Sequence, residues 1–133
     1  MSRALALAAA AIVALSGVAM AKRVNDARAL VVRGMNGTFC DPNNLGAGSD
    51  PQVTNNSEVQ NLSVACSPDG SLDVHQLRRS LPNPHICWAK LEDLEDRNEG
   101  VIVSTDPLPG NPNHCLVRDI TPNQMIRALH YRP

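Results

Sequence analysis

Four cysteines constrain this chain more than any other feature, because each cysteine can bond to only one partner. They are Cys40, Cys66, Cys87 and Cys115, and all follow an apolar N-terminal segment. An even number of cysteines behind an export signal is typical of disulfides formed in an oxidising compartment. Of the three possible pairings we prefer Cys40–Cys66 with Cys87–Cys115, on the expectation that Cys87 and Cys115 lie on neighbouring strands.

Residues 1–21 have the pattern of a signal peptide. An unbroken apolar run follows Arg3, and Ala19-Met20-Ala21 gives the small-x-small motif that signal peptidase cleaves. An uncleaved anchor is the alternative, but the run is mostly Ala and near the lower length limit for a membrane span. We therefore predict a secreted chain, periplasmic in a bacterium, that starts at Lys22 and has no membrane segment after cleavage. Trimming of the dibasic pair Lys22-Arg23 is a further alternative.

Residues 22–133 have the length of a single small domain. The formal net charge of the whole chain is −1, so no large positive field directs it to nucleic acid, and we expect no nucleic-acid partner. Phe, Tyr and Trp occur once each, which leaves few bulky groups for a core. Such a domain depends on covalent links for its stability. We expect it to be a monomer.

Alternating apolar and polar residues predict five or six short strands. The central feature is 85–91, which holds Cys87 and Trp88, and we expect this strand to anchor the core. A Ser-Pro-Asp-Gly turn predicts a β-hairpin between 58–66 and 71–75, with a helix from Ser71 as the alternative. Further strands are expected at 29–33, where a short helix is the alternative, at 101–105 and at 114–120.

The segments between these strands complete the fold prediction. Residues 36–56 are rich in Asn, Gly and Pro and predict a long irregular loop, while 92–96 predicts an acidic turn. The β-branched run 101–105 predicts a central strand. Thr121-Pro122 predicts the start of a closing helix that runs to about His130. The sum is an α+β, mainly β domain: a small disulfide-stapled antiparallel sheet with a short C-terminal helix.

One enzymatic hypothesis places Cys87 as a nucleophile. His114 would be its base and Asp119 the orienting acid. The Cys-Trp dipeptide occurs at such sites in papain-like and transglutaminase-like folds, but there the cysteine opens a buried helix rather than a strand. The other three cysteines also offer Cys87 an ordinary disulfide partner. We therefore assign no catalytic residue and keep this set as an alternative.

Metal binding and ribonuclease-like catalysis are two other possible functions, and each is compared with a purely structural role for the same residues. A His85-x-Cys87 pair with His114-Cys115 has soft ligands, but its spacing fits no compact zinc motif and oxidised cysteines cannot ligate. A ribonuclease-like site would combine histidines with arginines, yet no spacing singles out a pair. The acidic run 92–96 lacks the spacing of a calcium loop. We expect no metal and no cofactor.

Three Asn-x-Ser/Thr sequons begin at Asn36, Asn55 and Asn61, and are glycosylation candidates if the host is eukaryotic. In format the chain resembles the small cysteine-containing proteins that fungi and bacteria export, although no motif supports a family. The sequence thus predicts a secreted, effector-like, non-enzymatic protein that recognises an extracellular or periplasmic protein or glycan. A small secreted hydrolase, using Cys and His or His and Arg, is the alternative.

Overall fold

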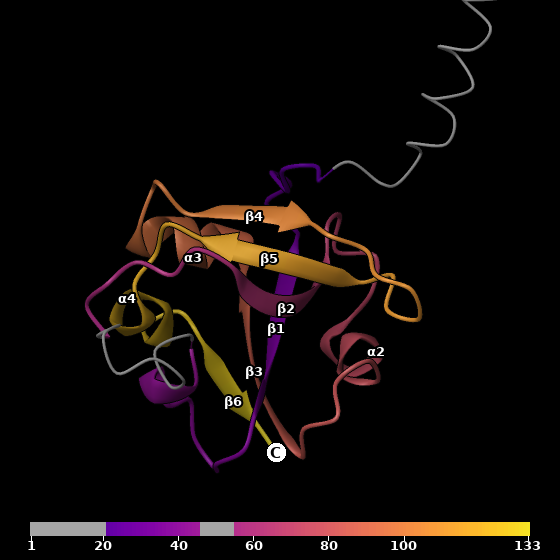
Figure 1. Ribbon diagram of the computed structural model, residues 1–133, viewed down its shortest axis with the longest axis horizontal. Coiled ribbons are helices and arrows are strands. Elements are labelled where there is room, and N and C mark those ends of the chain that lie inside the picture. Colours follow the sequence, from indigo (N-terminus) through magenta and orange to yellow (C-terminus); the bar gives the residue numbers. More distant parts are fainter. Residues whose placement is uncertain (1–20, 46–54) are drawn as a thin grey trace, which may run out of the picture.

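The computed structural model describes residues 21–45 and 55–133, and within these ranges the chain forms one six-stranded sheet (Figure 1). The strand order is β4-β5-β2-β1-β3-β6, and each neighbouring pair is antiparallel. This confirms the predicted α+β, mainly β fold. The strands are β1 Leu30–Met35, β2 Leu62–Ser67, β3 His85–Lys90, β4 Ile102–Thr105, β5 His114–Arg118 and β6 His130–Arg132. The helices are the 3₁₀ turn η1 Pro42–Asn44, α2 Val74–Arg78, α3 Leu91–Arg97 and α4 Pro122–Ile126.

Both faces of the sheet carry apolar side chains, because successive residues of a strand point to opposite faces. On β1, Val31 belongs to the larger core cluster and Val32 to the smaller one. The larger cluster includes buried side chains of α3 and α4, and the smaller one includes Val74 and Leu77 of α2. In Figure 1, α4 lies to the left of β1 and β3, and α2 to their right. The helices therefore cover both faces of the sheet.

The register of β1 leaves an opening in the sheet. β1 pairs with β3 along its whole length, from Leu30 to Met35. It pairs with β2 only from Leu30 to Val32, opposite Ala65 to Ser67. Beyond Val32 the two strands are no longer paired, so the ladder between them is incomplete at one end of the sheet.

All four cysteines form disulfides, as predicted, but the preferred pairing is wrong. The bonds are Cys40–Cys87 and Cys66–Cys115, each with its Cα atoms 5.9 Å apart. Cys87 lies on β3 and Cys115 on β5, and the strand order places β1 and β2 between them. The expectation failed because β3 and β5, although close in the chain, are not neighbours in this sheet. Cys66 instead reaches Cys115 across the paired strands β2 and β5.

The predicted hairpin after β2 is also wrong, and the helical alternative is right. Gly70 adopts a positive φ of 73°, which turns the chain after β2. The Asp73 side chain then accepts a hydrogen bond from the Gln76 amide, and the Gln76 side chain accepts one from the Asp73 amide. This capping box starts α2 and directs Val74 and Leu77 onto the sheet. The capping box therefore makes this segment a helix, although the alternating pattern of 71–75 favours a strand.

Two further segments differ from the prediction. The acidic residues 92–96 belong to helix α3, because Leu91 and Leu94 both face the core and are buried. The strand expected to be central, β4, lies at the edge of the sheet. An N-terminal segment covers part of that edge: the Val24 amide donates to the Val103 carbonyl at 2.7 Å. This backbone pairing explains how an uncharged, β-branched strand is tolerated there.

The C-terminal helix is present but shorter than expected. α4 begins after the Thr121 capping box, as predicted, and ends at Ile126 rather than near His130. The chain then adds β6 beside β3. Trp88 is only half-buried at the border of the smaller cluster, with its ring 4.7 Å from that of His130, so the core does not centre on it.

Candidate functional site

The structure excludes the enzymatic hypothesis in which the Cys87 thiol is the nucleophile. The Cys87 sulfur is bonded to Cys40 and is buried, so it cannot act as a nucleophile. Two of the proposed metal ligands, Cys87 and Cys115, are oxidised, and the Tyr131 hydroxyl lies 2.7 Å from Nδ1 of a third, His85. Within residues 21–45 and 55–133, no group of three or more His, Cys, Asp or Glu side chains could hold a metal ion.

His114 has a carboxylate partner, but it is not Asp119. His114 lies at the start of β5 and Asp119 just beyond its end, so the strand itself separates them. Nδ1 of His114 is 2.9 Å from the Asp106 carbonyl oxygen and 3.0 Å from the Asp106 carboxylate. Both partners are acceptors, so Nδ1 carries a proton and donates it. Asp106 fixes the ring, which leaves Nε2 as the nitrogen able to contact a ligand.

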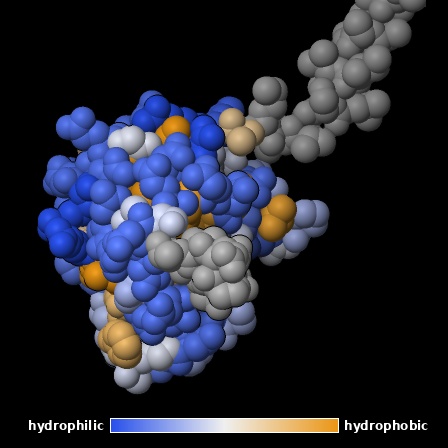
Figure 2. All heavy atoms as spheres, turned by 60° about the vertical axis from the view of Figure 1, so that its left-hand side comes forward, coloured by the Kyte–Doolittle hydropathy of each residue, from blue (hydrophilic) through white to orange (hydrophobic). Residues whose placement is uncertain are grey.

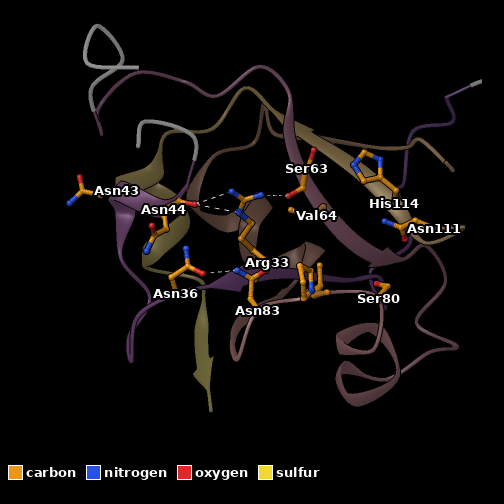
Figure 3. Close-up of a pocket in the computed structure, with 13 residues that line it drawn as sticks. Arg33, Asn36, Asn43, Asn44, Ser63, Val64, Ser80, Asn83, Asn111 and His114 are labelled. Atoms are coloured by element: carbon orange, nitrogen blue, oxygen red, sulfur yellow. Dashed lines mark hydrogen bonds between the residues drawn. The ribbon is translucent and has the colours of Figure 1, made fainter. Parts of the chain in front are cut away.

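His114 lines a cleft of about 490 Å³ at the open end of the sheet, where β1 and β2 separate (Figure 3). The cleft lies in the size range of small-molecule sites. Four separate parts of the chain contribute to it: the end of β1 with η1, the start of β2, the segment after α2, and the loop before β5. The described lining residues are Arg33, Gly34, Asn36, Asn43, Asn44, Ser63, Val64, Ser80, Leu81, Pro82, Asn83, Asn111 and His114.

Arg33 occupies the gap between the separated strands. Its Nη1 donates to the Ser63 carbonyl oxygen at 2.7 Å, and its Nε and Nη2 both donate to the Asn44 carbonyl oxygen at 3.3 Å. Figure 3 shows the guanidinium lying between these two residues. Burial lowers the pKa of Arg33, although an arginine stays charged at any ordinary pH.

The described residues of this site offer no acidic counterpart to the charge of Arg33. Among the described residues that line the cleft, none is Asp or Glu, and none of the ion pairs found in the described chain involves Arg33. Within the described residues, the guanidinium is held by the dipoles of two backbone carbonyls. A half-buried cation held in this way favours an anionic group that enters from solvent.

Asparagine side chains form much of the remaining polar surface. Asn83 donates its amide to the Asn36 side-chain oxygen at 2.9 Å, across the mouth of the cleft. Gly34 allows this arrangement, because a Cβ at that position would lie 2.0 Å from the Asn83 side-chain oxygen. Asn111 differs from these residues. Its side-chain oxygen is buried and, in the part of the chain that the structure describes, has no hydrogen-bond partner.

Sequence reasoning missed this cleft, although it noted that Asn is frequent. Arg33 was not singled out from the sequence, and only the shortened β1–β2 ladder shows that it fills a gap. Of the sequon residues, Asn36 and Asn61 are exposed, whereas Asn55 is half-buried and donates its amide to Asn43 at 3.0 Å. Asn36 is therefore both a sequon residue and part of the cleft lining.

Comparisons with models of protein families, with curated proteins and with solved structures found no match to this chain. In the described residues, no helix is both long enough and apolar enough to span a bilayer. The two disulfides in so small a chain are typical of an extracellular protein in an oxidising compartment.

Proposed function

We propose that this chain is a small exported recognition protein that binds a polar extracellular ligand in the cleft between β1 and β2. The observation that supports it most is the half-buried Arg33, whose described hydrogen bonds end on neutral carbonyls and which faces no acidic group among the described lining residues. A charge placed in this way costs folding free energy, and a bound ligand compensates for that cost.

Export is supported by two independent features. Disulfides persist in oxidising compartments, and the predicted signal sequence at residues 1–21, which lies largely outside the described residues, directs a chain there. The surface is also suited to free diffusion: the face in Figure 2 is mostly hydrophilic, with scattered apolar spots. Among the described residues, Phe39 and Leu108 are the large hydrophobic side chains classed as exposed. The secreted protein should begin at Lys22.

Filling the cleft tests this function directly. Ser63 lines the cleft and is exposed, so Ser63→Trp blocks the space without disturbing the core. Gln60→Trp is the matched control, because Gln60 is exposed, three residues away and outside the lining. Oxidised wild type and both variants are applied to glycan and peptide arrays. We expect Ser63→Trp to lose the wild-type signal and Gln60→Trp to keep it. A signal that both variants retain, or no signal for the wild type, rejects the proposal.

A hydrolase remains the second candidate because His114 and Arg33 line the same cleft. A histidine oriented by a carboxylate is a common general acid or base, and an arginine stabilises a developing anion. The test is cleavage of RNA and of polysaccharides by wild type, His114→Gln and the exposed control His75→Gln. Turnover that only His114→Gln abolishes supports this candidate, and absence of turnover rejects it.

A further inference from the structure

We propose that the ligand is a saccharide with a carboxylate, of the hexuronic acid class, with Arg33 binding the carboxylate and the Asn111 side chain contacting a sugar hydroxyl. This inference rests on the proposed function and names its substrate class. It combines a cation that has no acidic neighbour among the described lining residues with an asparagine side chain that lines the same cleft.

The guanidinium of Arg33 has N–H donors that can bind a ligand. An arginine carries five N–H donors in a planar fork. Within the described chain, one donor each from Nε, Nη1 and Nη2 is engaged, which leaves two N–H groups, one on each Nη atom. Two neighbouring N–H groups match the spacing of the two oxygens of a carboxylate. The hydrogen bonds to Asn44 and Ser63 hold the fork in place before the ligand arrives.

The charge of the cleft fits one carboxylate and not a polyanion. In the described lining, Arg33 is the permanent cation, and His114 adds a second positive charge only when protonated. The formal net charge of the chain is −1, which does not attract highly sulfated glycans or nucleic acid. The ligand therefore presents a single acidic group to the cleft, on an otherwise neutral unit.

The rest of the lining favours a sugar over a peptide. Asn and Ser side chains supply both donors and acceptors, and a sugar hydroxyl acts as either. Asn111 contributes one of these polar side chains from the loop before β5. Apolar side chains in the described lining are limited to Val64, Leu81 and Pro82, which form no deep socket for the bulky anchor of a peptide.

The test compares the methyl glycoside of galacturonic acid, which carries one carboxylate, with its methyl ester, which keeps the shape and removes the charge. Binding is measured by calorimetry on the oxidised full-length secreted protein. A hydrogen-bonded charge pair is worth roughly tenfold to hundredfold in affinity, so we expect the acid to bind tighter by that factor. Equal affinity for acid and ester overturns this inference. If Ser63→Trp then abolishes both, the proposed function still stands.

Two substitutions separate the two contacts. Arg33→Gln should remove the preference for the acid, whereas Asn111→Ala should weaken acid and ester by the same factor. Arg79→Gln is the control, because Arg79 is exposed and outside the lining. If Arg33→Gln does not fold by circular dichroism, Arg33→Lys keeps the charge but loses the fork and should reduce the preference. An unchanged preference in the folded Arg33 variant, or array binding to acidic peptides in place of sugars, overturns the inference.

Discussion

The two disulfides close loops of nearly equal size, which allows their roles in the native structure to be compared. Cys40–Cys87 spans 47 positions and Cys66–Cys115 spans 49. In the chain-entropy model a closed loop of this length stabilises the fold by about 4 kcal/mol at room temperature, through the unfolded state. That term is almost identical for the two bonds. Any difference in the unfolding free energy lost when each bond is removed therefore arises from the folded protein.

The native environments of the two bonds differ. Cys66 and Cys115 are both buried in the larger cluster, whereas only Cys87 of the other pair is, so Cys66→Ala with Cys115→Ala leaves the larger cavity. Cys40 is half-buried and attaches the segment before η1 to β3. That segment leads to Asn44, whose carbonyl oxygen holds the Arg33 guanidinium. Removing Cys40–Cys87 should therefore loosen the cleft as well as destabilise the fold.

Urea unfolding without reductant measures both effects on stability. We expect the Cys40→Ala, Cys87→Ala variant to lose about 4 kcal/mol of unfolding free energy, and the Cys66→Ala, Cys115→Ala variant to lose more. Ligand binding, measured where both variants are folded, should weaken in the first and persist in the second. A loss below about 1 kcal/mol for either pair contradicts the entropic argument. Full binding without Cys40–Cys87 contradicts the assigned role of that bond.

Three further substitutions test the packing and the turns by urea or thermal unfolding. Leu94→Ala should lower the free energy of unfolding by about 2–5 kcal/mol, because Leu94 is fully buried. Leu108→Ala, at an exposed position, is its control, and equal losses for both variants would be inconsistent with the core described. Thr121→Ala removes the cap of α4 and should cost about 1 kcal/mol; no change would mean that the cap is dispensable. Gly70→Ala should cost more than about 1 kcal/mol, because a Cβ there lies 2.4 Å from the Arg28 carbonyl oxygen and φ is positive; a neutral result would show that this turn relaxes.

Local patterns predicted the strands well and their arrangement poorly. β1 and β3 lie within a residue or two of the predicted 29–33 and 85–91, because β-branched and alternating residues favour extended backbone. Sheet order depends on contacts between distant segments, which no local pattern encodes. The chain moves from β2 to β3 on the far side of β1, and from β4 back to β5 beside β2. The wrong disulfide pairing and the wrong place of β4 both follow from this.

The cleft could not be predicted from the sequence for the same reason. Arg33, Ser63, Asn83 and Asn111 come from four segments, and only Ser63 stands within a motif, the sequon that begins at Asn61. The cleft is marked by the place where β1 stops pairing with β2. That place is set by the strand register, which is a property of the folded sheet. His114 was singled out from the sequence, but its partner Asp106 was not, because a proline-rich loop brings Asp106 back beside it.

The observed bonds are interleaved along the chain, since Cys66 lies between Cys40 and Cys87, and Cys87 lies between Cys66 and Cys115. A protease that cuts once anywhere from Cys40 to Cys115 therefore leaves the two pieces covalently joined. The sequential pairing of Cys40 with Cys66 would have lacked this property, because one cut between Cys66 and Cys87 would release two independent halves. In a compartment that contains proteases, a clipped chain would keep its intact mass plus one water until a reductant separates it.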